Sequence, residues 1–144
     1  MISGSCLCGQ VKYQVDDQIH MINHCHCSMC RKVHGAAFGS FLHAEADGFR
    51  WVGGSELIKT YQAPQRDDRC FCCNCGSNVP VIEKEDKNVI IPAGTLDTDP
   101  GIKPIMHIFT GSKAQWYEIT DALPQFDTFP SDSWLEQALN IKNE

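Results

Sequence analysis

The chain has 144 residues, of which 42% are hydrophobic, so it can bury one full core without needing a second domain. Its formal net charge is -6 at pH 7 and its longest basic run is Arg31-Lys32, which argues against nucleic acid as a partner. No apolar run is long enough to span a membrane and residues 1–5 lack the pattern of an export signal. We therefore expect a cytoplasmic protein with no membrane partner.

The N-terminal third predicts short strands around one turn of helix. Residues 10–15 alternate polar and apolar side chains with the period of a strand, and residues 19–23 form a second candidate strand. Residues 27–32 predict a single helical turn, because two residues between paired ligands wrap the backbone around a metal, and Gly35 ends it. Residues 36–42 are small and aromatic and predict a buried strand.

The middle of the chain predicts two hairpins on either side of a polar loop and a cysteine-rich segment. The expected strand pairs are residues 49–52 with 56–61, across a Gly53-Gly54 turn, and residues 78–82 with 88–91. Residues 62–68 form the polar loop.

Near the C-terminus the only clear helix signal follows one last strand. Residues 107–109 predict that strand, and Ser133 with Glu136 has the spacing of a helix capping box. We therefore expect a mainly β fold with a short C-terminal helix, built as a single domain over residues 1–144.

Nine cysteines dominate the chemistry of the sequence: Cys6, Cys8, Cys25, Cys27, Cys30, Cys70, Cys72, Cys73 and Cys75. A disulfide framework is disfavoured, because the count is odd, no export signal is seen and the spacings are only one to two residues. Such spacings are typical of metal sites with thiolate ligands.

The cysteines divide into a group of four and a group of three. Cys6 and Cys8 cannot fill a tetrahedral site alone, and Cys72 with Cys75 forms a zinc-knuckle pair, so joining the two pairs gives a closed structural site. The remaining thiols, which are Cys25, Cys27 and Cys30, leave one coordination position open. Zinc sites that catalyse reactions keep such a position for water or substrate.

Two alternatives remain at this stage. Cys70, Cys73, His24 or His26 could complete the second site, which would make both metals structural and the protein a non-catalytic binding module. A thiol-redox enzyme that uses Cys70 or Cys73 is the third reading. His107, between two apolar residues, is more typical of a core histidine than of a proton shuttle.

The cysteine groups resemble those of the glutathione-dependent formaldehyde-activating enzymes, also called the Gfa or centromere-protein-V family. The resemblance rests on residues 4–9, on residues 24–32 with Gly35 and Phe38, and on residues 71–72 and 75–77. It continues through residues 94–97, Pro104, residues 107–109, Lys113 and Trp116.

This resemblance implies a β-tent (Mss-four-like) fold of small antiparallel sheets held by two zinc ions. The first would be structural, at Cys6, Cys8, Cys72 and Cys75, and the second catalytic, at Cys25, Cys27 and Cys30. The implied activity is that of a carbon–sulfur lyase, similar to S-hydroxymethylglutathione synthase, with a thiol such as glutathione and formaldehyde or a related small aldehyde as substrates. Tyr61 is followed here by Gln62-Ala63-Pro64 instead of the small hydroxyl residues common in the family, which leaves the thiol itself open.

Overall fold

The structure, a computed structural model, describes residues 1–64, 67–83, 85 and 87–140 in two compact units. The first unit holds Met1–His20 and Leu42–Ile102, and the second holds Met21–Phe41 and Lys103–Glu144, of which 103–140 are described. In the described part of the chain, no helix has the length and apolar character needed to cross a membrane.

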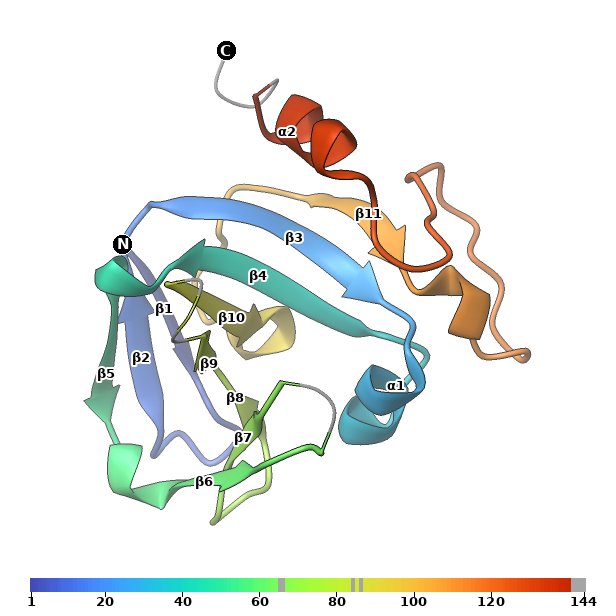
Figure 1. The fold of residues 1–144 in the computed structure, drawn as a ribbon. Helices are drawn as coiled ribbons and strands as arrows, with labels where there is room; N and C mark the ends of the chain where they lie inside the picture. Colours follow the sequence, from blue (N-terminus) through green and yellow to red (C-terminus); the bar gives the residue numbers. More distant parts are fainter. Residues whose placement is uncertain (65–66, 84, 86, 141–144) are drawn as a thin grey trace. The chain divides into compact units, whose positions relative to one another are not determined.

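The first sheet of the first unit has a buried tyrosine on its middle strand. It contains three antiparallel strands in the order β1 (Ile2–Ser5), β2 (Lys12–Val15) and β5 (Phe49–Gly53), as Figure 1 shows. Tyr13 of β2 is almost fully buried, and its ring stacks on Phe49 and meets the edge of Trp51. Residues 12–15 of the alternating segment 10–15 thus form the expected strand, which begins two residues later than predicted.

The second sheet of this unit carries Cys72 at the end of β7 and Cys75 in the turn that follows. Its order is β6 (Ile58–Tyr61), β7 (Arg69–Cys72) and β8 (Asn78–Val79), all antiparallel. Residues 65 and 66 of the predicted polar loop lie outside the described residues.

The hairpin predicted across Gly53-Gly54 is wrong, because its two strands belong to different sheets. β5 pairs with β2, and β6 pairs with β7. Gly54 has a positive φ of 71°, and a Cβ there would lie 2.2 Å from the carbonyl oxygen of Gln10. The glycine pair therefore lets the chain cross close to the Gln10 backbone from one sheet to the next instead of folding back on itself.

The hairpin predicted later in the chain is present in shortened form. β9 (Val81–Glu83) pairs antiparallel with β10 (Asn88–Pro92), and β10 lies beside β4 (Gly39–Glu45). Residues 78–79 instead form β8, which is separated from β9 by Pro80. A proline has no backbone N–H for the ladder, so the break falls there.

The second unit is arranged around β3 (Ile19–Cys25), which lies between the start of β4 and β11 (Pro104–Ile108) in Figure 1. β11 runs parallel to β3 and places Ile108 opposite Cys25. After β3, the helix α1 (Ser28–His34) forms the predicted turn, and Gly35 ends it in the left-handed conformation at φ 59°.

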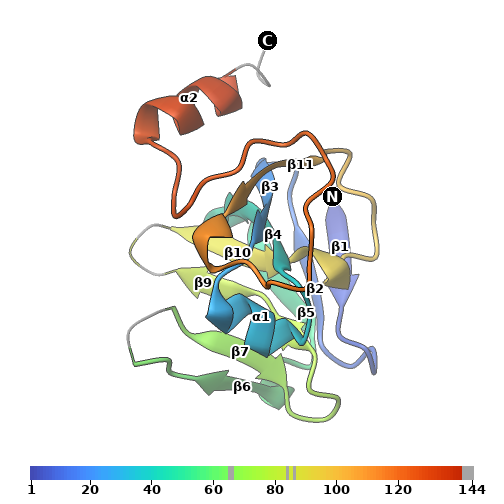
Figure 2. The same cartoon turned by 90° about the vertical axis from the view of Figure 1, so that its right-hand side faces the viewer.

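Beyond β11 the chain is irregular until the helix α2 (Asp132–Asn140), shown in red in Figure 2. The expected helix is thus confirmed, but its cap is Ser131, whose Oγ accepts a hydrogen bond from the Trp134 backbone at 3.2 Å. Trp134 also packs edge-on against Phe126. The short 3-10 helices of the chain are η1 (Ala46–Gly48), η2 (Ser55–Leu57), η3 (Ala93–Thr95) and η4 (Thr110–Ser112).

The prediction of a mainly β protein with a short C-terminal helix is confirmed. β9 and β10 pair antiparallel whereas β11 runs parallel to β3, so the five-stranded sheet that contains these strands is mixed. α1 is a second helix that the sequence indicated only as a turn.

Candidate metal centres

Four thiols of the first unit converge in one group: Cys6, Cys8, Cys72 and Cys75. Their sulfur atoms all lie within 4.8 Å of one another. Cys6 and Cys72 are buried, whereas Cys8 is exposed. Four thiolates at this separation match the ligand set of a closed tetrahedral zinc site.

Two tight loops bring these thiols together. The backbone N–H of Val11 donates to the Cys6 sulfur at 3.3 Å, which holds the first loop closed before β2. The second loop turns at Gly76, whose φ is 77° and whose N–H donates to the Cys72 carbonyl. The buried residues around this group are apolar, with Val11 and Val79 in the same cluster as Cys6 and Cys72.

Hydrogen bonds prepare two of these thiols for ionisation. The Ser77 hydroxyl, followed by backbone N–H groups, lowers the pKa of Cys75 to about 5. A side-chain hydrogen bond from Asn74 lowers the pKa of Cys8. Because zinc binds thiolates and not thiols, both shifts favour metal binding.

Three buried thiols of the second unit form the other group: Cys25, Cys27 and Cys30. Their sulfurs also lie within 4.8 Å of one another. Cys25 ends β3, Cys27 is the N-cap of α1, and Cys30 lies in its first turn. The Cys27 sulfur accepts the Cys30 backbone N–H at 3.3 Å, so the cap itself draws two of the ligands together.

The three thiols lie so close together that their ionised forms would need a cation beside them. Hydrogen bonds with Cys27 and Cys30, together with burial, raise the pKa of the Cys25 thiol well above its ordinary value. A thiolate in such a cluster needs a positive charge beside it. A divalent metal ion that accepts soft sulfur ligands, such as zinc, supplies that charge.

Neither neighbouring histidine belongs to the three-thiol group in the part of the chain that the structure describes. His24 Nδ1 lies 2.8 Å from Ser40 Oγ, and His26 Nε2 lies 2.7 Å from His107 Nδ1. Each ring has one nitrogen in another contact, and neither histidine is grouped with the three sulfurs, so the alternative that His24 or His26 closes the site gains no support from the described residues.

Cys70 and Cys73 belong to neither thiol group among the described residues. The Cys70 sulfur lies 3.5 Å from Thr60 Oγ1 across the β6–β7 ladder, and Cys73 is exposed. Substitutions of these two cysteines can therefore serve as controls for substitutions of the seven grouped cysteines.

A hydrogen-bonded chain connects His26 to an acidic residue nearer the surface. Beyond the His26–His107 contact, His107 Nε2 lies 2.9 Å from Asp121 Oδ2 and 3.1 Å from Oδ1. The two histidines are 0% and 1% exposed, whereas the Asp121 side chain is 46% exposed. Sequence reasoning treated His107 as a core residue and did not identify Asp121, since no local pattern connects positions 26, 107 and 121.

Aromatic rings and burial shield His26 and His107, the inner residues of this hydrogen-bonded line, from water. Phe38 packs against His24, His26 and His107, with ring centroids 4.5 to 5.9 Å apart, and it also meets Tyr117 edge-on. Burial, followed by repulsion from His107, lowers the pKa of His26 to about 4. The hydrogen bond from His107 lowers the pKa of the Asp121 carboxyl.

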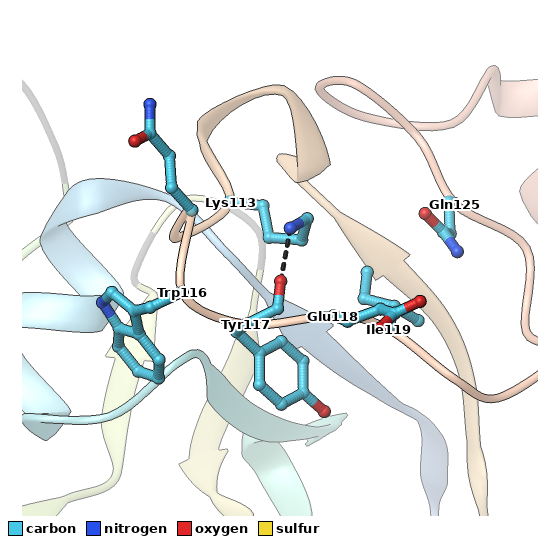
Figure 3. A pocket seen from close by; sticks show the side chains of 7 residues that line it. Lys113, Trp116, Tyr117, Glu118, Ile119 and Gln125 are labelled. Atoms are coloured by element: carbon cyan, nitrogen blue, oxygen red, sulfur yellow. Dashed lines mark hydrogen bonds between the residues drawn. The ribbon is translucent and has the colours of Figure 1, made fainter.

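A cleft of about 500 Å³ opens in the irregular segment after β11 (Figure 3). Its lining residues are Lys113, Gln115, Trp116, Tyr117, Glu118, Ile119 and Gln125. Lys113 Nζ donates to the carbonyls of Ala114 and Tyr117, which fixes the ammonium group against the backbone. Tyr117 belongs both to the cleft and to the ring cluster at Phe38, so the cleft lies next to the rings that surround His26.

The positions of Arg31, Lys32 and Asp97 are explained by local structure. Arg31 and Lys32 lie at the C-terminal end of α1, where basic side chains interact favourably with the helix dipole. Asp97 lies near β1, where its Oδ2 accepts a hydrogen bond from Ser5 Oγ at 2.7 Å.

Comparisons with known proteins agree with the cysteine pattern. The model of the family described as glutathione-dependent formaldehyde-activating enzyme matches residues 1–112. A protein of Halomonas elongata, provisionally named a glutathione-dependent formaldehyde-activating enzyme, is 31% identical over 128 residues, which cover 83% of this chain and 81% of that one. A solved structure of a Rhodobacter sphaeroides protein superposes with a TM-score of 0.53 at 24% identity, over 71% of this chain and 91% of that chain. This last likeness concerns the fold alone.

Proposed function

Because the chain belongs to the family of glutathione-dependent formaldehyde-activating enzymes, we propose that it is a zinc-dependent carbon–sulfur lyase that works in the direction of synthesis. It joins a thiol, glutathione or a similar compound, to formaldehyde or a related small aldehyde. The product is an S-hydroxymethyl adduct.

The observation that carries this proposal is the difference between the two thiol groups. The first group has four sulfurs that all lie within 4.8 Å of one another. The second has three, and no further histidine, cysteine, aspartate or glutamate of the described residues joins it. A metal with four thiolates has no position left for a reactant, whereas a metal with three keeps one. We therefore propose a structural role for the metal ion of the first group and a catalytic role for that of the second.

Cys25, Cys27 and Cys30 would hold the catalytic ion, and Cys6, Cys8, Cys72 and Cys75 would hold the structural ion. When bound to three thiolates, zinc supplies Lewis acidity, which lowers the pKa of a thiol or polarises a carbonyl oxygen.

The residues of the chain hold the three ligands in place and exclude water. α1 fixes Cys27 and Cys30 through its cap, and β3 delivers Cys25. Phe38, packed on His24 and His26, covers the segment with an apolar ring. In the net reaction the thiol sulfur bonds to the carbonyl carbon, the carbon–oxygen double bond becomes single, and the thiol proton ends on that oxygen. No oxidant or reductant is needed.

The proposal has four further parts. We propose the β-tent arrangement for this mainly β chain, two zinc ions per chain, and residues 1–144 acting as one zinc domain. We also expect the protein to work in the cytoplasm, where reduced glutathione is abundant and free thiols persist.

The direct experiment mixes the zinc-loaded protein with glutathione and formaldehyde and follows adduct formation by exchange NMR. We expect exchange faster than the spontaneous reaction. Replacing glutathione by free cysteine or 2-mercaptoethanol shows whether the peptide portion of the thiol matters.

The matched variants are Cys27→Ser and Cys70→Ser, which remove one thiol inside and one outside the metal groups. Cys27→Ser should abolish the acceleration, and Cys70→Ser should leave it intact. If fully zinc-loaded protein gave no acceleration with any of the thiols, the lyase proposal would fail and a non-catalytic binding module would be favoured. If activity were lost in Cys70→Ser while both zinc ions stayed bound, thiol-redox chemistry would be favoured.

A further inference from the structure

Three polar side chains form a continuous line from the three-thiol segment towards the surface. His26 lies between Cys25 and Cys27 in the sequence, and its Nε2 meets His107 Nδ1 at 2.7 Å. The other nitrogen of His107 meets the Asp121 carboxylate at 2.9 Å. Both contacts have the length of strong hydrogen bonds.

The hydrogens of this line can be placed by chemistry. A carboxylate only accepts, so the Nε2 of His107 carries the hydrogen that it donates to Asp121. With both rings neutral, His107 Nδ1 is then an acceptor, and the hydrogen between the two rings belongs to His26 Nε2. Asp121 therefore determines the tautomer of His107, and His107 determines the tautomer of His26.

The same line fixes the backbone between two of the thiols. The His26 N–H donates to the Ile108 carbonyl at 2.9 Å, immediately after the parallel register that places Ile108 opposite Cys25. The residue between Cys25 and Cys27 is thus attached to β11 twice, once through its backbone and once through its ring.

The arrangement is costly for a residue that only fills the core. Under the tautomer above, Nδ1 of His26 keeps a bare lone pair, and it is buried without a hydrogen-bond partner among the described residues. Leaving a buried polar atom unpaired destabilises the folded state, which an apolar side chain would avoid. A buried histidine pair with one unpaired atom is therefore better explained by function than by packing.

Building on the proposed function, we propose that His107 and Asp121 are positioning residues for the three-thiol centre. They lock the ring of His26 in one orientation and one tautomer, and through His26 they hold the Cys25-to-Cys27 segment in the geometry that binds the open metal. Partners that orient a metal site in this way are typically worth 10- to 100-fold in metal affinity.

Amide side chains provide matched variants, because a glutamine amide reaches the position of Nε2 and an asparagine amide reaches the position of Nδ1. His26→Gln keeps a donor facing His107, and His26→Asn removes it. In the same way, His107→Asn keeps an acceptor facing His26 and loses Asp121, while His107→Gln does the reverse. Asp121→Ala removes the outer end of the line at a half-exposed position, with Asp127→Ala as the exposed control.

The readout is the release of zinc to a competing chelator, measured together with the absorption spectrum of the cobalt-substituted protein. The four-thiol group serves as an internal control in each sample, since it lies in the other unit. We expect His26→Asn and His107→Gln to loosen one zinc per chain by about 10- to 100-fold and to shift its cobalt bands. His26→Gln should stay close to the parent protein, and His107→Asn, which keeps the acceptor but loses Asp121, should weaken the zinc less than His107→Gln does. Asp121→Ala should weaken the same zinc while Asp127→Ala should not.

Equal affinity and equal spectra in His26→Asn and His26→Gln would overturn the proposal. If His26→Asn failed to fold, both zinc ions would be lost together, and the Asp121→Ala and Asp127→Ala pair would decide: the same affinity in both would overturn it. The test is separate from the lyase assay. A parent protein that binds two zinc ions but lacks activity would contradict the proposed function and leave the positioning role standing, whereas an active protein insensitive to these changes would contradict only the positioning role.

Discussion

The Cys8 and Cys72 sulfurs lie 3.9 Å apart although the two residues are 64 positions apart in the chain. This contact links the loop before β2 to the turn after β7, and Cys6 and Cys75 complete the group. The apolar cluster around it is small, so a metal bound by these four thiols would supply much of the local stability.

Cys8→Ser should therefore destabilise the protein more than a surface cysteine change does. Removing one of four ligands costs several kcal/mol of metal-linked folding free energy, which we expect to lower the Tm by more than about 10 °C. Cys73→Ser, at an exposed cysteine outside both groups, is the control. Thermal unfolding followed by circular dichroism, with and without chelator, measures both. Equal Tm values for the two variants would argue against a structural metal.

Gly4 is predicted to tolerate no side chain. A Cβ at Gly4 would lie 2.2 Å from the Tyr13 hydroxyl and 2.6 Å from the Thr95 carbonyl oxygen, which is backbone and cannot move aside easily. Gly4→Ala should cost about 3 kcal/mol in urea unfolding, because the buried ring must shift and lose its 2.7 Å contact with Thr95 Oγ1. At Gly94 a Cβ meets nothing within 4 Å. Gly94→Ala should accordingly change stability little.

The cap of α1 and the second metal group share one sulfur, that of Cys27. In metal-free protein, Cys27→Ser should keep the cap, because a hydroxyl also accepts the Cys30 N–H, and Cys27→Ala should lose about 1 kcal/mol relative to it. Both variants should lose the zinc of this group. Urea unfolding after chelation gives the first comparison, and zinc counting gives the second. A Cys27→Ala variant as stable as Cys27→Ser would show that the cap contributes nothing.

We expect His43 to make the stability of the protein depend on pH. Burial, with repulsion from His20, lowers the pKa of His43 to about 4 from its ordinary value near 6.5. The unfolded chain therefore binds the proton first, so this stability is complete above about pH 6.5 and is lost as the pH falls towards 4, by up to about 3 kcal/mol. His43→Gln should flatten the decline over that range. Urea unfolding of both proteins at each pH, in the same zinc buffer, tests this; parallel pH profiles would contradict it.

The membership of the two thiol groups could be predicted from the sequence because it depends on local cysteine spacing. C-x-C and C-x-x-C spacings bring sulfurs together whatever the rest of the fold does, and both groups appear in the structure with the predicted members. The helical turn at residues 27–32 follows from the same spacing and is present as α1.

The strand pairing and the hydrogen-bonded line of His26, His107 and Asp121 could not be predicted from the sequence. Both depend on how distant segments align with one another, and no local pattern encodes that alignment. Residues 49–52 form a strand as expected, but Phe49 and Trp51 pack on Tyr13 of β2, and this contact outweighs the turn signal of the glycines. His26 and His107 are 81 positions apart and meet only because β11 runs parallel to β3. Asp121 lies in a segment without regular structure, so no periodic pattern points to it.

The two thiol groups differ in when they can form during synthesis. All three sulfurs of the second group are present once Cys30 has been made, so this segment can capture a metal ion while most of the chain is still missing. The four-thiol group must wait for Cys75 and must close a long loop, which has an entropic cost that grows with loop length. Metal loading of the four-thiol group would therefore report that the chain has folded, whereas under the proposed positioning role an ion on the nascent three-thiol group would be held only loosely until His107 and Asp121 have been made.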